Sequence, residues 1–160
     1  MRFVCRVRPA QSSDAPAISE LVNHYAERGR MLHRSLESVY HSLREFQVAE
    51  PDGAPGGALL GCVAVEIFWA DLAEVKSLAV APEFLRRGVG GQLLAAAITD
   101  ARRLGVRKLF ALTYEKEFFA GYGFETIARD TLPEKVWQDC IACPKADACD
   151  EIAMLLHLDQ

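Results

Sequence analysis

A glycine-rich turn with two adjacent arginines is the segment of this sequence best suited to bind a phosphorylated ligand. It reads Arg86-Arg87-Gly88-Val89-Gly90-Gly91 and follows the apolar run Leu78-Ala79-Val80. The glycines let the backbone approach a ligand closely, and a helix starting at the turn would point free N–H groups and its positive dipole end at an anion. Arginine adds donors for phosphate oxygens. The turn is neither a Walker A loop nor a dinucleotide fingerprint, because the Gly-Lys-Ser/Thr ending and a third glycine at the required spacing are missing.

A group of cysteines near the end of the sequence is a second candidate for chemistry. Its members are Cys140, Cys143 and Cys149. With Asp150 or His157 as a fourth ligand, the group is a weak candidate for a zinc site. Because a second cysteine pair is missing, reduced or redox-responsive thiols are favoured and no metal is predicted. Cys5 and Cys62 lie in apolar segments and are predicted to be core residues.

The composition is that of one soluble globular domain spanning residues 1–160. Hydrophobic residues make up 51% of the chain and charged residues 25%, which is ordinary for a chain that buries a substantial core. The net charge of −4 argues against a nucleic-acid partner, so any anion site must be local. No signal peptide or membrane-length apolar run is visible. The odd count of five cysteines then indicates a reducing, cytoplasmic location without a membrane partner.

The elements that must position these residues follow from apolar periodicity. Strands are predicted at 2–8, 46–50, 60–68, 73–80, 108–113, 124–128 and 151–158. Helices are predicted at 15–28, 36–43, 90–104 and 117–123, with a brief one within 132–140. The segments 46–50 and 60–68 form a hairpin, whereas 73–80 and 108–113 flank a helix and are predicted to be parallel. The predicted class is therefore a mixed α/β fold.

The ends of the first two helices carry local signals. Ser12, Ser13 and Asp14 offer N-cap oxygens for the first helix, and Gly29 is predicted to end it. Ser35 is the predicted N-cap of the second helix. Arg34 precedes it, at a junction that can aim a side chain toward a ligand. The alternative, a solvated surface arginine, is slightly favoured by residue type alone.

At this point a resemblance to the GNAT N-acetyltransferases becomes clear. Leu78-Ala79-Val80-Ala81-Pro82-Glu83 with Arg86-Arg87-Gly88-Val89-Gly90 resembles that family's acetyl-CoA-binding motif, and Phe118-Phe119-x-x-x-Gly123-Phe124 resembles its penultimate helix and turn. In element order the resemblance spans nearly the whole chain. It implies a GNAT fold, with a mixed, mostly antiparallel sheet that is splayed at the acetyl-CoA site and flanked by helices.

The resemblance also implies roles in binding acetyl-CoA. Backbone groups of Leu78, Ala79 and Val80 would pair with the pantetheine arm, and the amides from Arg86 to Gly91 would hold the pyrophosphate. Leu85 stands where the family commonly has Gln or Arg, which matters little because phosphate capture relies chiefly on backbone amides. Phe119 is expected at the same site, where many members carry a tyrosine as general acid.

The catalytic groups are harder to assign. Because phenylalanine cannot donate a proton, Tyr114, Thr113 or solvent must protonate the departing CoA thiolate. Glu74 is the best-placed base for an ammonium group, with Glu66 second. The alternative for Glu74 is a rim carboxylate facing solvent, and the two interpretations are about equally supported. Tyr122 is assigned to packing.

Three segments narrow the resemblance to the acetyltransferase domain of N-acetylglutamate synthases: 29–35, 73–80 and 132–133. This implies that Arg34 contacts a substrate carboxylate and that Glu74 is the base, with Lys76 and Lys135 as further cations for a second carboxylate. The implied reaction is acetyl transfer from acetyl-CoA to the α-amine of L-glutamate, in arginine biosynthesis, by direct attack in a ternary complex.

Two alternatives remain. One is a GNAT enzyme for another small amine or a protein N-terminus, and the other is a CoA-binding regulatory module that has lost catalysis. A homodimer is an expectation from the resemblance alone.

Overall fold

The computed structural model describes residues 4–53, 58–133 and 151–158. The chain divides into two compact units. Unit 1 comprises residues 1–65 and 75–100, and unit 2 comprises residues 66–74 and 101–160. The helices are α1 (Ala15–Ala26), α2 (Leu36–His41), α3 (Val89–Arg103) and α4 (Lys116–Ala120). The strands are β1 (Cys5–Pro9), β2 (Phe46–Pro51), β3 (Gly61–Trp69), β4 (Leu72–Val80), β5 (Lys108–Thr113), β6 (Glu125–Thr126) and β7 (Ile152–His157).

The strands form a seven-stranded mixed sheet in the order β1-β2-β3-β4-β5-β7-β6. The pairs β1–β2, β2–β3, β5–β7 and β6–β7 are antiparallel, and β4–β5 is parallel. The predicted hairpin and the predicted parallel strands are therefore confirmed, as is the mixed α/β class. The β4–β5 register consists of three pairs, Leu72–Lys108, Ala73–Leu109 and Glu74–Phe110.

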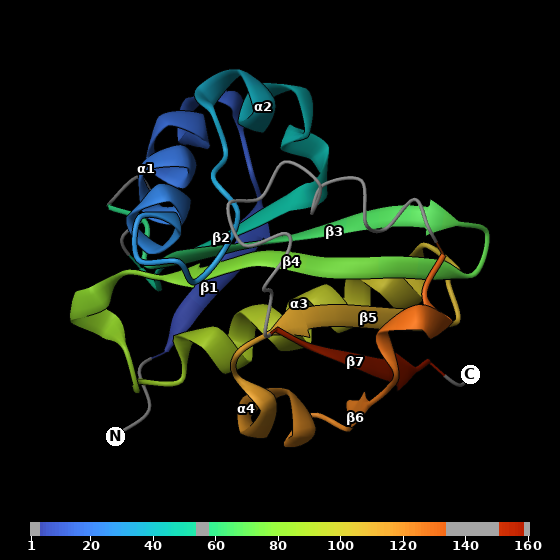
Figure 1. Cartoon of the computed structure of the whole chain (residues 1–160). Coiled ribbons are helices and arrows are strands. Elements are labelled where there is room, and N and C mark those ends of the chain that lie inside the picture. Colours follow the sequence, from blue (N-terminus) through green and yellow to red (C-terminus); the bar gives the residue numbers. More distant parts are fainter. Residues whose placement is uncertain (1–3, 54–57, 134–150, 159–160) are drawn as a thin grey trace. The chain divides into compact units, whose positions relative to one another are not determined.

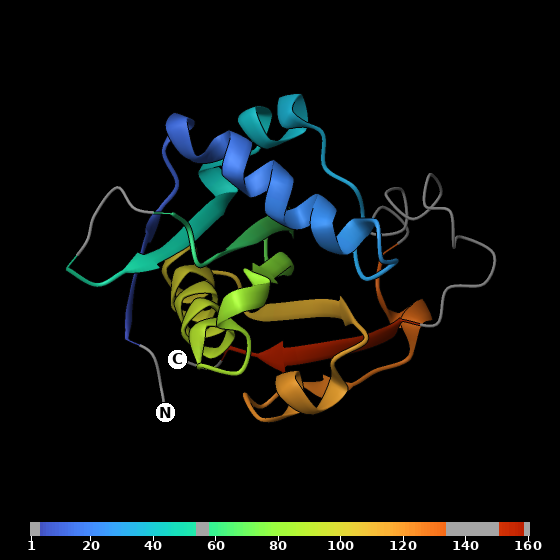
Figure 2. The ribbon, with the colours of Figure 1, turned by 90° about the vertical axis from the view of Figure 1, so that its left-hand side faces the viewer.

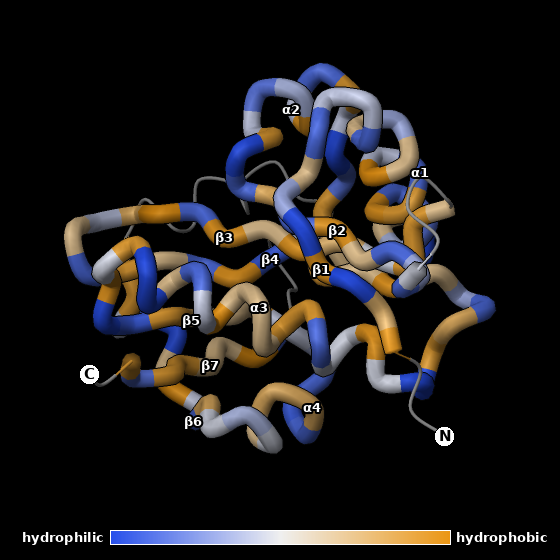
Figure 3. The backbone as a smooth tube through the Cα atoms, turned by 180° about the vertical axis from the view of Figure 1, so that it is seen from behind, coloured by the Kyte–Doolittle hydropathy of each residue, from blue (hydrophilic) through white to orange (hydrophobic). Residues whose placement is uncertain are grey.

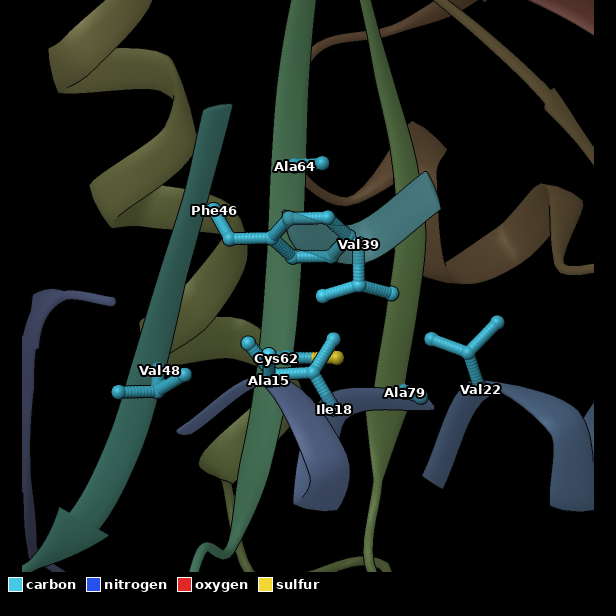
Figure 4. Close-up of a cluster of buried hydrophobic side chains, with 9 residues drawn as sticks. All are labelled: Ala15, Ile18, Val22, Val39, Phe46, Val48, Cys62, Ala64 and Ala79. Carbon is cyan, nitrogen blue, oxygen red and sulfur yellow. The ribbon is translucent and has the colours of Figure 1, made fainter. Parts of the chain in front are cut away.

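Unit 1 buries its apolar side chains between its helices and strands. α1 and α2 lie side by side (Figure 1) and cover one face of the strands, while α3 lies against the opposite face (Figure 2). The cluster under α1 and α2 is drawn in Figure 4 and consists of Ala15, Ile18, Val22, Val39, Phe46, Val48, Cys62, Ala64 and Ala79. Each large side chain buried in this way contributes about 1.5–3 kcal/mol to folding.

Gly61 on β3 lies where β4 and α3 both come close to the backbone. A Cβ atom at this position would lie 2.7 Å from the carbonyl oxygen of Ala79 and 2.8 Å from Cδ1 of Leu93. The side chain of Gln47 also reaches α3, where it donates to the carbonyl of Ala96 at 3.4 Å. The absence of a side chain at Gly61 thus lets β3, β4 and α3 pack directly on one another.

The two helix starts differ from one another in how they are capped. Ser35 caps α2 as predicted, since its Oγ accepts from the Ser38 N–H at 3.1 Å. Asp14 holds the N-cap position of α1 but makes no capping hydrogen bond, so the prediction of N-cap oxygens for this helix was wrong for Asp14. Its carboxylate instead accepts from the Gln11 N–H at 2.7 Å. Gly29 follows α1 with a φ of 71°, as expected for a residue that ends a helix.

The Asp14 carboxylate belongs to an ion cluster with Arg8 and Glu50. Arg8 on β1 donates to Asp14 through Nη1 at 2.8 Å and Nη2 at 3.1 Å, and its Nε lies 3.2 Å from Oε2 of Glu50. The Glu50 side chain is 2% exposed. The hydrogen bond from Arg8 lowers the pKa of Asp14, against the opposing effect of burial. The Asp14 carboxylate therefore pairs with Arg8 on β1 and does not cap α1.

Unit 2 is held by strand pairing and by aromatic side chains. β7 pairs with both β5 and β6, and most of its length is hydrophobic (Figure 3). Phe68 and Phe110 lie with their ring centroids 5.7 Å apart. The strand predicted at 124–128 is much shorter, since β6 covers Glu125–Thr126. The helix predicted within 132–140 falls almost entirely outside the described residues. None of the helices described here is long and apolar enough to cross a membrane.

Candidate functional site

The middle of β4 departs from regular strand geometry at Ser77. This residue has a φ of 53°, which is rare for a residue other than glycine inside a strand. Its carbonyl accepts from the Cys62 thiol at 3.4 Å, and its hydroxyl accepts from Nη1 of Arg34 at 3.4 Å. The alternation of side chains expected along 73–80 is therefore interrupted at Ser77, and the backbone of the residues that follow is re-aimed.

The end of β4 is tied to α1 by Tyr25. The Tyr25 hydroxyl donates to the carbonyl oxygen of Val80 at 2.5 Å, and burial raises the pKa of Tyr25. Ala79 and Val80 are buried, whereas Leu78 is half-buried. The Val80 oxygen keeps a second lone pair for a ligand. This contact does not follow from the sequence pattern, in which the one signal is a tyrosine, with its polar hydroxyl, on the apolar side of a helix.

The glycine-rich turn has the backbone geometry of an anion site. Arg86 and Gly88 have φ angles of 64° and 85°, a mixture of left- and right-handed residues that turns successive N–H groups toward one point. α3 begins at Val89, and its first bond runs from the Gln92 N–H to the Gly88 carbonyl at 3.1 Å. The N–H groups of the first turn, up to Gly91, precede that bond and have no intrahelical acceptor.

The charges around this turn suit a phosphate. Arg86 and Arg87 are exposed, and Cζ of Arg87 lies 5.6 Å from the ring centroid of Phe84. The Gln92 side chain donates to the Gly88 carbonyl at 3.2 Å and so holds the turn from inside. The backbone and charges of the turn therefore suit a phosphate group, and the assignment of these residues to the pyrophosphate of a nucleotide-type cofactor stays a prediction.

Arg34 is held in place instead of being freely solvated. Arg34 is half-buried. Its Nε donates to Ser38 Oγ at 3.2 Å, and its Nη1 donates to Ser77 Oγ. The guanidinium carbon lies 5.2 Å from the centroid of the Phe46 ring. Within the described part of the chain, no partner is found for Nη2, which leaves two N–H groups for an acceptor such as a carboxylate. Lys76, on β4 beside Ser77, is half-buried.

Unit 2 holds the candidates for proton transfer. Glu74 is 8% exposed and lies opposite Phe110 in the β4–β5 register, so it is not a carboxylate on a solvent-facing rim. Thr113 is also 8% exposed, and its Oγ1 accepts from the Glu115 N–H at 2.8 Å. Tyr114 and Glu66 are half-buried.

Phe119 is a core residue of unit 2. It is 5% exposed and lies edge-on to Phe124 and Phe118, with ring centroids 5.2 and 5.3 Å apart. Tyr122, expected to pack, is 38% exposed and lies 5.7 Å from the Phe118 ring. The cofactor role of Phe119 stays a prediction.

The cysteines divide between two parts of the chain. Cys62 is buried, and burial raises its pKa to about 12. Cys5 is half-buried. Among the residues that the structure describes, no three His, Cys, Asp or Glu side chains form a metal-binding group. The group made of Cys140, Cys143 and Cys149 lies outside those residues, as does Lys135.

Comparison with known proteins gives matches over most of the chain. The profile of the Acetyltransferase (GNAT) family matches residues 16–124. An uncharacterized N-acetyltransferase of Chlorobaculum tepidum is 41% identical over 95% of this chain and 96% of its own length. An amino-acid acetyltransferase of Mycobacterium tuberculosis is 38% identical over 84% of this chain and 78% of its own.

A solved structure extends the comparison to a ligand complex. The N-acetylglutamate synthase of Neisseria gonorrhoeae, complexed with coenzyme A and N-acetyl-glutamate, superposes with a TM-score of 0.86 at 34% identity. The match covers 100% of this chain and 36% of that synthase. The chain thus spans about a third of the length of that relative.

Proposed function

Because the chain belongs to the GNAT acetyltransferase family and is an acyltransferase that uses acetyl-CoA, we propose that it acetylates the α-amino group of L-glutamate. The product would be N-acetylglutamate, a compound of arginine biosynthesis. The synthase complexed with N-acetyl-glutamate supports this choice of acceptor, and the amino-acid acetyltransferase of M. tuberculosis supports an amino acid as the class of acceptor.

The state of Arg34 is the observation that carries the proposal. An amino-acid acceptor brings a carboxylate next to its amine, and such a carboxylate needs a charged donor that is already oriented. Arg34 offers one, since Ser38 and Ser77 hold Nε and Nη1 while Nη2 stays available. Lys76 and Lys135 are proposed partners for the γ-carboxylate, which distinguishes glutamate from apolar amino acids.

Acetyl-CoA is proposed to bind along the end of β4 and the glycine-rich turn. The amides from Arg86 to Gly91 would hold its pyrophosphate, with the Arg86 and Arg87 side chains adding charge. Backbone groups of Leu78, Ala79 and Val80 would pair with the pantetheine arm, and Phe119 is a further proposed contact of the cofactor.

The proposed chemistry is a direct transfer between the two bound substrates. Glu74 takes a proton from the ammonium group, directly or through water, so that the free amine can attack. The amine nitrogen bonds to the thioester carbonyl carbon, whose oxygen is polarised by backbone N–H groups near Leu78. The nitrogen gives up its second proton to solvent as the carbon–sulfur bond breaks, and the sulfur leaves as a thiolate that takes a proton from Tyr114, Thr113 or solvent. No covalent bond to the protein forms.

An assay of thiol release tests the function. The protein is supplied with acetyl-CoA and with each amino acid in turn, and the appearance of free CoA is recorded. Turnover confined to glutamate is expected. Preferred turnover of another amine or of a peptide N-terminus would contradict the choice of acceptor, and CoA binding without turnover on any amine would point to a regulatory module.

Three wider features of the protein remain proposals. A single GNAT domain over residues 1–160 would make the chain sufficient for catalysis by itself. A homodimer would show as twice the chain mass in sedimentation. The cytoplasm is the proposed location, because the five cysteines suit a reducing compartment.

A further inference from the structure

Arg34 lies in the connection between α1 and α2, which has no regular secondary structure from residue 27 to residue 35. Backbone N–H and C=O groups in such a segment find no ladder partners of their own, so other groups must satisfy and fix them. A guanidinium at the end of a long side chain is aimed well only if its own backbone is also fixed. The residues that bind the Arg34 backbone therefore help to determine where its guanidinium points.

Asn23 on α1 brackets the backbone of Arg34. Its Oδ1 accepts from the Arg34 N–H at 2.8 Å, and its Nδ2 donates to the Arg34 carbonyl at 2.8 Å. One side-chain amide thus satisfies both backbone groups of the same residue, as a neighbouring strand would. Asparagine suits this task because its side chain ends in one acceptor and one donor at fixed separation.

Ser19 completes the bracket from one turn earlier on α1. Its hydroxyl donates to the Arg34 carbonyl at 3.0 Å and also accepts from Nδ2 of Asn23 at 3.3 Å. Residues four apart lie on one face of a helix, so both side chains face the same segment. Asn23 is half-buried, as is Ser19.

The backbone of Arg34 and its guanidinium are held by different residues. Asn23 and Ser19 fix the backbone, whereas Ser38, Ser77 and Phe46 contact the guanidinium. Losing either set leaves the other in place but lets the arginine occupy more conformations. The cost of re-ordering it would then be paid each time a carboxylate binds.

We propose that Asn23 is a positioning residue for the acceptor amino acid, acting by holding the Arg34 backbone so that Nη2 faces the substrate carboxylate. The inference rests on the proposed function, since it assigns Arg34 to the acceptor. Asn23 itself touches no reacting atom. Ser19 makes a smaller contribution to this positioning, because its hydroxyl binds only the carbonyl of Arg34.

Steady-state kinetics with glutamate and acetyl-CoA as separately varied substrates test the proposal. Asn23→Ala should raise the KM for glutamate about tenfold and leave the KM for acetyl-CoA within about twofold, as expected when one rotamer-rich side chain must be ordered anew on binding. Ser19→Ala should raise the KM for glutamate about two- to threefold on the same grounds. Glu20→Ala, an exposed neighbour on α1, is the matched control and should change neither value.

The double variant Asn23→Ala/Arg34→Ala shows whether Asn23 acts through Arg34. If it does, the KM for glutamate of the double variant equals that of Arg34→Ala alone. Fully additive effects would overturn the proposal, and so would an Asn23→Ala variant whose two KM values rise together.

Amide hydrogen exchange supplies a readout that needs no activity. Exchange at the Arg34 N–H should be faster in Asn23→Ala than in the parent, and unchanged in Ser19→Ala, whose lost bond lies on the carbonyl side. If Arg34→Ala leaves the KM for glutamate unchanged, the proposed role of Arg34 fails, and the positioning role falls with it. If Arg34→Ala raises that KM and Asn23→Ala does not, only the positioning role fails.

Discussion

The hydroxyl of Tyr25 and the carbonyl oxygen of Val80 lie 2.5 Å apart, which joins the first long helix to the last residue of β4. The bond links residues that are 55 positions apart in the sequence. Since Val80 belongs to the segment proposed to pair with pantetheine, the bond places α1 in contact with the proposed acetyl-CoA site.

Removing this hydroxyl should weaken both folding and acetyl-CoA binding. Tyr25→Phe is expected to lower the free energy of unfolding by about 0.5–1.5 kcal/mol, the usual net value of one hydrogen bond. It should also raise the KM for acetyl-CoA while leaving the KM for glutamate nearly unchanged. Denaturant unfolding and initial rates check the two effects. Tyr40→Phe, at an exposed tyrosine of α2, should do neither, and an equal loss in both variants would refute the assignment.

The geometry of the glycine-rich turn predicts that a loss of stability and a loss of acetyl-CoA binding can be separated. Gly88→Ala places a side chain at a φ of 85°, at a cost of about 1–2 kcal/mol, and should also raise the KM for acetyl-CoA at least severalfold. Gly53→Ala is the matched control, because Gly53 has a φ of 81° and no atom lies within 4 Å of the position that its Cβ would take. The control should lose similar stability with an unchanged KM. A normal KM in both would argue against an anion site at the turn.

Gly61 should be intolerant of any side chain. Because its Cβ would lie 2.7 Å from a backbone oxygen, Gly61→Ala is expected to lower the free energy of unfolding by about 1–3 kcal/mol, as overpacking does. Gly121→Ala is the comparison, since its nearest contact would be 3.4 Å away, and should stay within about 0.5 kcal/mol of the parent. Equal stability of the two variants, measured by thermal or urea unfolding, would contradict the close packing of β3 on β4 and α3.

The ion cluster predicts a loss of stability in acid. The pKa of Asp14 is lowered in the folded state from the ordinary value of 3.8, so its contribution is complete above that ordinary value. It is lost as the pH falls through the lower, folded-state pKa, because the unfolded chain binds the proton first. Asp14→Asn should therefore show a smaller change in unfolding free energy between pH 5 and about pH 2 than the parent. Asp130→Asn, at an exposed aspartate, should retain the parent's dependence.

Glu74 should affect the rate more than binding. Glu74→Gln is expected to lower kcat by about 10²–10⁴, the range typical of a lost general base, with small changes in both KM values. Glu66→Gln distinguishes the second candidate and should keep most of the activity. An unaffected rate in Glu74→Gln would remove this residue as the base.

Apolar periodicity was enough to predict most of the fold. The alternation in β1 and the spacing of Ile18 and Val22 on α1 arise from one buried face, which the sequence displays directly. The glycine-rich turn was equally visible, because Gly88 serves a backbone conformation that few other residues adopt. In these cases the physical cause acts between near neighbours in the chain.

The site needed the structure wherever a contact joins distant residues. Neither the bracket from Asn23 nor the bond from Tyr25 follows from local pattern, since both residues also fit an ordinary amphipathic helix. The positive φ of Ser77 carries no glycine-like signal. Asp14 shows the reverse error, because a strong local N-cap signal lost to an arginine on β1.

Because Cys62 is buried, the rate at which its thiol reacts depends on how often the protein opens around it. Only the thiolate reacts with disulfide reagents, and with a pKa of about 12 the thiolate is nearly absent at neutral pH. In a reaction monitored through the free thiol of CoA, Cys62 should therefore add no signal while the protein is folded. Modification of Cys62 would therefore require the layer between α1 and β3 to open, so the extent of its reaction would report that opening.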